Sequence, residues 1–333
     1  MERAMTSTPR GVSFIVPAYN EERSIHDTIA RIVDALSKTG IPHEIIVVND
    51  GSTDTTREKV EAFPEVRVIN HPVNIGYGNA IKAGIRNASY EWIGIVDADG
   101  SYPIEQIPAL LEPMRNGYDM VVAVRANIHE VDGAVKRLFR RLFVRAIRLL
   151  NDARIQDPNS GFRVFRKEVA MGLMPFLCGT FSFTTSLTVL TAGLYYFIKY
   201  VPVTYAHRVG KSKVRHFRDS LRTLQYVTQG VIYFNPIKFF LLLLLAMAAS
   251  VWLPCAAMAV AGLGKLSLAC LVAGTSVFML MGMAGIGDII RVASDRQRAQ
   301  AAWGLRSESD LPVAIATTRA PNNSGATREP GPG

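Results

Sequence analysis

Two aspartates separated by one residue, Asp97 and Asp99, could hold a metal ion together. They follow residues 92–96, an apolar run typical of a buried strand, and a strand continuing through them would turn both carboxylates to one side. Carboxylate oxygens suit Mg²⁺ or Mn²⁺, which commonly takes its other ligands from water and a substrate diphosphate. Such an ion would act as a Lewis acid on a departing diphosphate, although a solvated acidic turn has the same spacing.

A third aspartate, Asp50, follows the apolar residues 44–48 and could accept hydrogen bonds from a nucleoside base or ribose. The Ser, Thr and Asp at 52–54 are typical helix caps, so this segment also has a structural interpretation. Gly76 and Gly78 do not form a dinucleotide-binding fingerprint, because no third glycine follows at the required offset. The missing third glycine argues against a Rossmann oxidoreductase. The two glycines present favour a chain that passes close to a nucleotide.

Basic residues occur where a phosphate could be held. Arg125 ends the apolar run 120–124, residues 157–163 read Asp-Pro-Asn-Ser-Gly-Phe-Arg, and Arg208 and Lys213 precede a long apolar stretch. Each alone is expected to be a solvated surface group. Together they could clamp phosphates, since the arginine fork matches phosphate oxygens bidentately.

Cysteine and histidine do not indicate another chemistry. The three cysteines, Cys178, Cys255 and Cys270, are too few and too scattered for a disulfide framework or a zinc site, and a reducing compartment is expected. The six histidines pair with no serine or cysteine nucleophile, and only His207, beside Arg208, stands near a candidate site residue.

The elements that must position these residues alternate between strands and helices. Strands are expected at 11–16, 44–48, 66–69, 92–96 and 120–124, and helices at 21–38, 54–63, 78–88 and 104–114. Strands that are apolar throughout and alternate with helices predict an α/β fold with a mostly parallel sheet, covered on both faces. The polar clusters at 19–21, 49–52, 74–78 and 97–99 fall at strand ends, where such sheets bind ligands.

The positive charge of the chain is local. The formal net charge is +9, and six of the 37 Lys and Arg lie in residues 136–148 and eight in residues 196–238. Residues 135–150 have the spacing of a basic amphipathic helix, which could lie on an anionic membrane surface or face the core with a solvated basic side. Nothing else in the chain indicates nucleic acid, which is not expected as a partner.

Two uncharged runs, residues 239–262 and 266–287, predict a transmembrane hairpin. At about 1.5 Å per residue each helix would exceed the roughly 30 Å hydrocarbon core of a bilayer. Arg291 and the basic residues before the first run place both flanks in the cytoplasm by the positive-inside rule. The predicted location is therefore the plasma membrane, crossed twice, with the large domain and both termini cytoplasmic. A buried helical pair in a soluble protein is the alternative.

The predicted organisation has four parts. Residues 1–10 form a disordered N-terminus without a secretory signal, 11–230 the main domain with its juxtamembrane amphipathic helices, 231–290 the two membrane helices, and 291–333 a largely disordered cytoplasmic tail.

Five segments occur in an order that resembles the family 2 glycosyltransferases. They are Phe-Ile-Val-Pro-Ala-Tyr-Asn-Glu-Glu at 14–22, Val-Val-Asn-Asp-Gly-Ser-Thr-Asp at 47–54, Asn-Ile-Gly-Tyr-Gly-Asn-Ala-Ile at 74–81, Asp-Ala-Asp at 97–99, and the 157–163 segment. The resemblance, over roughly residues 11–215, is to the branch of dolichol-phosphate mannose synthase and related polyprenyl-phosphate glycosyltransferases. It implies a GT-A (nucleotide-diphospho-sugar transferase) fold and an inverting transfer that depends on Mg²⁺ or Mn²⁺.

The same resemblance implies roles for individual residues. Nucleotide binding falls to Pro17, Tyr19, Glu21, Asp50, Gly76, Lys82, Asp97 and Ala98, and metal binding to Asp97 and Asp99. Acceptor and phosphate binding falls to Arg125, Ser160, Arg163, Arg208 and Lys213, and the catalytic set is Asp99, Asp157, Arg125 and Arg208. One position departs from the family pattern: many dolichol-phosphate mannose synthases have Gln where this chain has Ser101, which weakens an assignment of mannose and GDP.

The resemblance implies a donor such as GDP-mannose or a UDP-hexose and a polyprenyl (dolichyl or undecaprenyl) phosphate acceptor in the bilayer. A phosphate monoester has a second pKa of about 6 and needs little deprotonation, so Asp157 is expected to orient an arginine and is a weaker candidate for a general base. Two alternatives stay open. One is a family member that acts on a glycan or glycolipid hydroxyl, although the chain lacks the Arg-Trp dipeptide of processive synthases. The other is a non-catalytic nucleotide-sugar-binding anchor.

Overall fold

A computed structural model describes residues 10–126, 155–206, 228 and 236–304 of the 333-residue chain. Several predictions fall outside the described residues: the basic helix over 135–150, Arg208 and Lys213. The two predicted disordered ends also lie outside them, except for Arg10 and residues 291–304.

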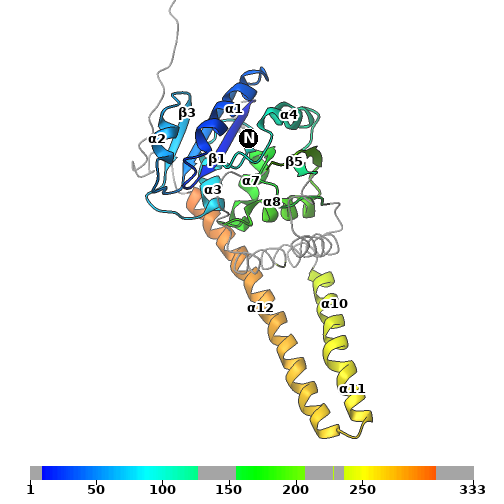
Figure 1. Ribbon diagram of the computed structural model, residues 1–333. Coiled ribbons are helices and arrows are strands. Elements are labelled where there is room, and N and C mark those ends of the chain that lie inside the picture. Colours follow the sequence, from blue (N-terminus) through cyan, green and yellow to red (C-terminus); the bar gives the residue numbers. More distant parts are fainter. Residues whose placement is uncertain (1–9, 127–154, 207–227, 229–235, 305–333) are drawn as a thin grey trace, which may run out of the picture.

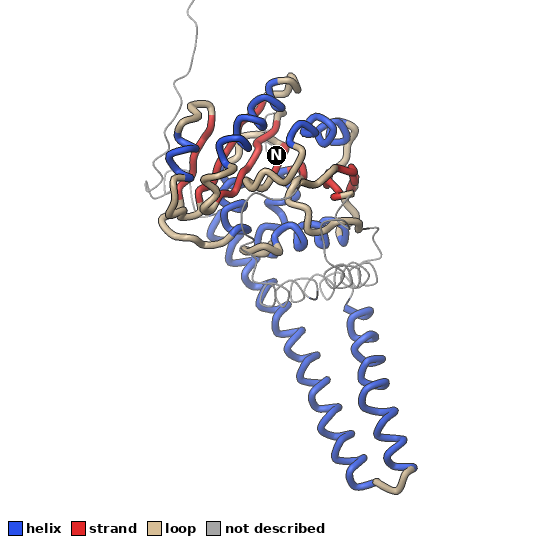
Figure 2. Tube along the Cα trace, in the orientation of Figure 1, coloured by secondary structure: helices blue, strands red, loops and turns tan. Residues whose placement is uncertain are grey.

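The described residues form one seven-stranded, mixed sheet in the order β3-β2-β1-β4-β6-β5-β7. The sheet lies among helices in the upper part of the molecule (Figures 1 and 2). The strands are β1 (Val12–Ala18), β2 (His43–Asn49), β3 (Val66–Asn70), β4 (Trp92–Ile95), β5 (Met120–Arg125), β6 (Arg163–Arg166) and β7 (Ile198–Val203). All neighbouring pairs are parallel except those of β6, which runs antiparallel to both β4 and β5. The mostly parallel α/β sheet predicted from the sequence is confirmed.

Helices cover both faces of the sheet. They are α1 (Ile25–Ser37), α2 (Thr56–Glu61), α3 (Tyr77–Asn87), α4 (Ile107–Arg115), α7 (Lys167–Leu173) and α8 (Phe183–Gly193), with short 3₁₀ turns η1 (Ile104–Gln106) and η2 (Met174–Phe176). Alternate residues of β1 point to opposite faces: Phe14 packs into the core under α1 and α4, and Ile15 into the core under α3, α7 and α8. The sheet is therefore buried on both sides, which explains why its strands are apolar throughout.

The observed elements differ from the predicted ones in two respects: β4 ends before the acidic turn, and β6, β7, α7 and α8 were not predicted. β4 ends at Ile95, so Asp97 and Asp99 lie in a turn, and the expectation that a continuing strand would align their carboxylates is wrong. The antiparallel strand β6 was not predicted, because its four residues carry two arginines and do not form an apolar run.

Two apolar helical segments project from the domain side by side (Figure 1). The first comprises α10 (Pro236–Met247), a π-helical turn η3 (Ala248–Trp252) and α11 (Leu253–Val260), and the second is α12 (Gly264–Gly304). Phe239–Val260 and Gly264–Asp288 are long and apolar enough to cross a membrane, and most of their residues are not buried in the protein. Helix α12 runs on past the second apolar segment and reaches the domain beside η2.

Candidate active site

The loops that follow β1 and β2 are tied together at the carboxyl edge of the sheet. Asn20 has a left-handed backbone (φ 52°), and its side-chain oxygen accepts a hydrogen bond from the Thr53 N–H at 2.8 Å. The Glu21 N–H donates to Thr56 Oγ1 at 2.8 Å. Pro17 is buried in β1, and Tyr19 and Glu21 are partly exposed beside this junction. These three predicted nucleotide-binding residues therefore lie together at one edge, next to the turn after β2.

Asp50 is buried and organises the segment that leads into α3. One carboxylate oxygen accepts hydrogen bonds from His71 Nδ1 (2.7 Å) and the Ile75 N–H (3.1 Å), and the other accepts from the Gly76 N–H (2.9 Å). His71 was not predicted as a site residue, because a histidine three residues before an Asn-Ile-Gly motif has no distinctive spacing. Asp50 thus shapes the loop beside the predicted nucleotide site, and its direct contact with a nucleotide stays a prediction.

The glycines of the Gly-Tyr-Gly motif have a role in packing. A side chain at Gly76 would lie 2.9 Å from the carbonyl oxygen of Gly179, and one at Gly78 would overlap the carbonyl oxygen of Cys178. The Asn79 N–H donates to the Gly179 carbonyl at 2.9 Å. These glycines allow α3 to pack against the backbone of residues 178–180, and their close passage past a nucleotide stays a prediction.

Lys82 also faces this neighbouring loop. Its Nζ donates a hydrogen bond to the Leu177 carbonyl, and burial, helped by the nearby Arg86, lowers its pKa to about 8. Lys82, which was predicted to bind the nucleotide, therefore donates a hydrogen bond to a backbone carbonyl of the protein.

Asp97 is held between α3 and the 157–163 turn. The Tyr77 hydroxyl donates a hydrogen bond to Asp97 Oδ1 at 2.7 Å, and a side chain at Gly161 would overlap the same carboxylate. Burial, and then the negative charge of Asp97, raise the pKa of Tyr77 well above its ordinary value, so the phenol stays a donor at neutral pH. Tyr77 lies within the 74–81 motif, but no role was predicted for it from the sequence.

Asp99 is buried, 4% exposed, two residues further along the turn. One of its oxygens accepts hydrogen bonds from both the N–H and the hydroxyl of Ser101. Ser101, which stands where the family pattern has Gln, therefore acts as a hydrogen-bond partner of Asp99. Ala98, predicted as a nucleotide contact, is buried between the two aspartates, and its carbonyl accepts from Thr28 Oγ1 at 3.3 Å.

The donor set of this turn fits a hard divalent cation in kind, since Asp97 and Asp99 offer carboxylate oxygens. Within the described ranges, no group of three or more His, Cys, Asp and Glu side chains is gathered as a metal site. Two carboxylates match the ligand number that Mg²⁺ typically takes from a protein when substrate phosphates complete its shell.

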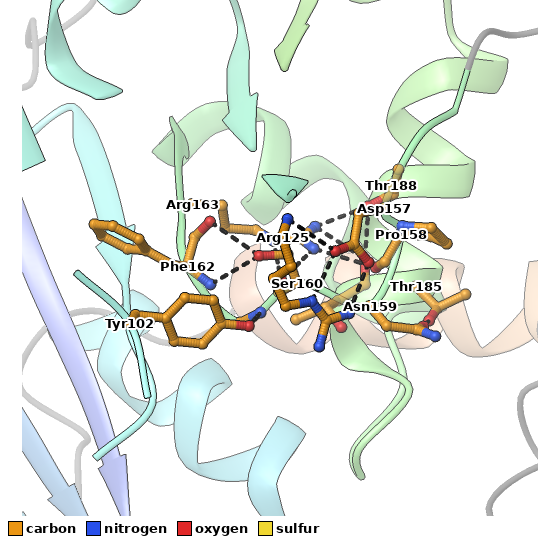
Figure 3. Close-up of polar contacts among 12 residues, drawn as sticks. Tyr102, Arg125, Asp157, Pro158, Asn159, Ser160, Phe162, Arg163, Thr185 and Thr188 are labelled. Carbon is orange, nitrogen blue, oxygen red and sulfur yellow. Dashed lines mark hydrogen bonds and ion pairs between the residues drawn. The ribbon is translucent and has the colours of Figure 1, made fainter. Parts of the chain in front are cut away.

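Arg125 and Asp157 form a bidentate ion pair beside the turn (Figure 3). Arg125 Nε and one terminal nitrogen each lie 2.7 Å from a different Asp157 oxygen, and the two side chains are only 11% and 9% exposed. Burial alone would lower the pKa of Arg125, but Tyr102 and Asp157 outweigh it and leave that pKa raised. Asp157 is therefore placed to orient the Arg125 guanidinium, and the part that the pair plays in catalysis stays a prediction.

Arg163 does not have the role predicted for it. The side chain is fully buried in β6, and its five N–H groups donate to the carbonyl oxygens of Pro158, Ser160 and Thr184 and to Thr188 Oγ1 (Figure 3). Because every donor is used inside the protein, Arg163 supports the turn and is not placed to bind a phosphate. Ser160 is likewise fully buried, and its hydroxyl bonds to the backbone of Phe162 at 3.4 Å; its predicted place near the acceptor stays a prediction.

The mostly parallel sheet, with an acidic turn after β4 and a buried Arg–Asp pair beside it, defines an α/β nucleotide-diphospho-sugar transferase fold. Solved structures of glucosyl-3-phosphoglycerate synthase from Mycobacterium tuberculosis share this fold. The complex with phosphoglyceric acid has a TM-score of 0.52 at 22% identity, covering 67% of this chain and 79% of the other. The complex with Mn²⁺, UDP and phosphoglyceric acid has a TM-score of 0.52 at 23% identity, covering 67% and 78%.

The chain belongs to glycosyl transferase family 2. Residues 13–173 match the family model. A dolichyl-phosphate beta-glucosyltransferase of Trichomonas vaginalis is 31% identical over 67% of this chain and 71% of its own length. A dolichol-phosphate mannosyltransferase of Pyrococcus furiosus is 33% identical, covering 61% and 59%, and an undecaprenyl-phosphate 4-deoxy-4-formamido-L-arabinose transferase of Pectobacterium atrosepticum is 33% identical, covering 52% and 57%. The chain thus spans under three fifths of the length of the last two relatives.

Proposed function

We propose that this protein is a membrane-anchored, inverting glycosyltransferase that moves a sugar from a nucleotide-sugar to a polyprenyl phosphate. The observation that carries the proposal is the combination of a buried Arg125–Asp157 pair beside the acidic turn with two apolar helices long enough to span a bilayer. The names of the family relatives support it, since all three described above act on dolichyl or undecaprenyl phosphate. Arginine suits a phosphate acceptor, and the apolar helices would keep the protein beside a lipid.

In the proposed reaction an oxygen of the acceptor phosphate attacks the anomeric carbon of the sugar. The bond from that carbon to the nucleoside diphosphate breaks, and the diphosphate leaves with the electron pair. The acceptor oxygen is already ionised near neutral pH, because a phosphate monoester has a second pKa of about 6. Asp157 would hold the Arg125 guanidinium in place, and Arg125 would offset the repulsion between the two phosphate groups.

Asp97 and Asp99 would hold a divalent cation. When bound, Mg²⁺ or Mn²⁺ would neutralise the charge that develops on the departing diphosphate. The synthase with the same fold has been crystallised with Mn²⁺, which supports a divalent ion of this kind.

The sugar is a separate question, since the relatives are named for mannose, glucose and a modified arabinose. The donor is therefore proposed only as a nucleotide-sugar such as GDP-mannose or a UDP-hexose. We further propose that the domain and both flanks of the hairpin face the cytoplasm, as the basic residues before Phe239 and the arginine at 291 suggest.

The test is release of nucleoside diphosphate by the full chain purified in detergent. The panel comprises GDP-mannose, UDP-glucose, UDP-galactose and UDP-N-acetylglucosamine, each with Mg²⁺ or Mn²⁺, and each with and without undecaprenyl or dolichyl phosphate. We expect release from one donor that requires both the metal and the lipid phosphate, with the sugar recovered in the lipid fraction.

The matched variant is Asp99→Asn. It keeps the size of the side chain, which accepts hydrogen bonds from Ser101, but removes its negative charge. Turnover should fall about 100-fold or more, because metal stabilisation of a transition state is worth several kcal/mol. Release that is indifferent to the lipid would favour a glycan or glycolipid acceptor or hydrolysis. No release from any donor, with intact nucleotide binding, would favour a non-catalytic anchor.

A further inference from the structure

The Asp97 carboxylate is confined by two segments that are far apart in the sequence. On one side the Tyr77 hydroxyl donates to Oδ1 at 2.7 Å. On the other side Gly161 lies so close that a side chain there would be 2.6 Å from Oδ1 and closer still to Oδ2. The carboxylate therefore has little room to rotate.

The Tyr77 side chain is itself held in place. It is the first residue of α3, between the two glycines whose backbones press against residues 178–180. Its ring stacks on Phe181, with centroids 5.7 Å apart and planes inclined by 17°. The hydroxyl is thus presented to Asp97 by a helix end and an aromatic stack, both of which are independent of Asp97.

The Gly161 side of Asp97 is equally ordered. Gly161 lies in the turn that begins at Asp157 and ends at the buried Arg163, and its N–H donates a hydrogen bond to the Tyr102 hydroxyl at 2.8 Å. No left-handed backbone angle is needed at Gly161, so the requirement for glycine there comes from the space that Asp97 occupies.

We propose that Tyr77 is a positioning residue for the metal ligand Asp97: its hydroxyl holds the carboxylate against Gly161 in the orientation that binds the divalent cation. This inference rests on the proposed function, in which Asp97 is a metal ligand. Hydrogen-bond partners of metal-ligating side chains orient those side chains, and their loss commonly weakens metal affinity by about 10-fold to 100-fold. Tyr77 takes no part in bond making.

The test is the affinity of the full-length, detergent-solubilised chain for Mn²⁺, measured from the loss of the free-ion electron paramagnetic resonance signal. The titration is run with Mn²⁺ alone and with Mn²⁺ plus UDP or GDP. Tyr77→Phe keeps the ring and its stack on Phe181 but removes the hydroxyl. We expect its Mn²⁺ dissociation constant to rise about tenfold, and the Mn²⁺ concentration for half-maximal turnover to rise with it. The rate at saturating Mn²⁺ should fall by a smaller factor.

Two further variants separate positioning from general damage. Tyr118→Phe is the matched control, since Tyr118 lies under Lys199 at the far end of β5, and it should leave Mn²⁺ affinity and melting temperature unchanged. Gly161→Ala should also weaken Mn²⁺ binding, because the added methyl displaces Asp97 without removing any hydrogen-bond donor.

The outcomes distinguish this inference from the function on which it rests. If Asp97→Asn weakens Mn²⁺ binding but Tyr77→Phe stays within twofold of wild type, the positioning role is overturned and the metal site stands. If neither variant changes Mn²⁺ binding, the metal assignment itself fails. A loss of Mn²⁺ affinity in Tyr77→Phe that comes with loss of the cooperative unfolding transition, retained in Tyr118→Phe, would show general damage and would also overturn the positioning role.

Discussion

At the scale of single residues, two arginines near the 157–163 turn show how burial decides the role of a charge. Arg163 donates all five N–H groups to oxygens of the protein, so its role is to stabilise the 157–163 turn. Arg125 uses Nε and one terminal nitrogen on Asp157, and the Tyr205 ring lies 5.5 Å from its guanidinium carbon. The proposed phosphate contact therefore falls to Arg125.

The Arg125–Asp157 pair should behave as one unit in a double-mutant cycle. Asp157→Asn and Arg125→Gln each leave a buried partner without its opposite charge, and each should lower the free energy of unfolding by about 3 kcal/mol. The double variant should lose clearly less than the sum of the two, in stability and in turnover, because the residues share one interaction. Urea denaturation and the release assay measure both quantities.

The exposed pair Arg31–Glu105 is the control, because it has the same bidentate geometry, at 2.7 and 2.9 Å, in a solvated position. Glu105→Gln should cost at most about 1 kcal/mol. Strictly additive losses at Arg125 and Asp157 would instead support an independent role for Asp157, such as a general base.

At the scale of elements, the start of α3 holds together the segments that form the candidate site. Its glycines let the helix pack against residues 178–180, Asp50 holds the segment that enters it, and Tyr77 reaches Asp97 from its first turn. The loop at 178–180 follows η2, beside which α12 reaches the domain. Helix α3 thus connects the acidic turn to the part of the domain nearest the apolar hairpin.

Gly78→Ala should disturb the packing of α3 against residues 178–180. The added methyl would overlap the Cys178 carbonyl oxygen and lie 2.7 Å from the carbonyl carbon of Gly179, and backbone on both sides leaves little room to adjust. We expect a loss of about 1–3 kcal/mol in the free energy of unfolding, measured by urea denaturation. Gly172→Ala, in α7 with open space around it, should be neutral or stabilising by up to about 1 kcal/mol. Equal effects of the two substitutions would contradict the close packing described for α3.

At the scale of the whole molecule, the apolar hairpin and the sheet domain form two distinct parts (Figure 1). The connection between the two apolar segments is short, since α11 ends at Val260 and α12 begins at Gly264. If both segments cross a bilayer, this short turn lies on one side and the domain on the other.

The proposed topology can be checked by cysteine labelling in intact cells. With the three native cysteines replaced, Leu263→Cys at the exposed tip of the hairpin should react with a membrane-impermeant maleimide from outside. Glu58→Cys, exposed on α2, should react only after the cells are lysed. Labelling of both positions only after lysis would contradict a spanning hairpin and favour helices that stay on the cytoplasmic side.

Much of the fold could be predicted from the sequence, because burial on both faces leaves a pattern of apolar runs. The strands β1 to β5 and the helices between them were predicted to within a few residues, and the acidic and polar clusters were correctly assigned to strand ends. The Asp157 interaction with an arginine was also predicted, since a phosphate-binding guanidinium needs an orienting carboxylate.

Only the tertiary structure decided which side chains the site uses. Arg125 ends β5 and Arg163 begins β6, and nothing in their local sequence tells an arginine paired with one carboxylate from a guanidinium saturated by Pro158, Ser160, Thr184 and Thr188. Tyr77 and Gly161 are 84 residues apart, yet both touch Asp97. The physical reason is that periodicity records burial along one element, whereas a hydrogen bond between loops depends on how several elements pack.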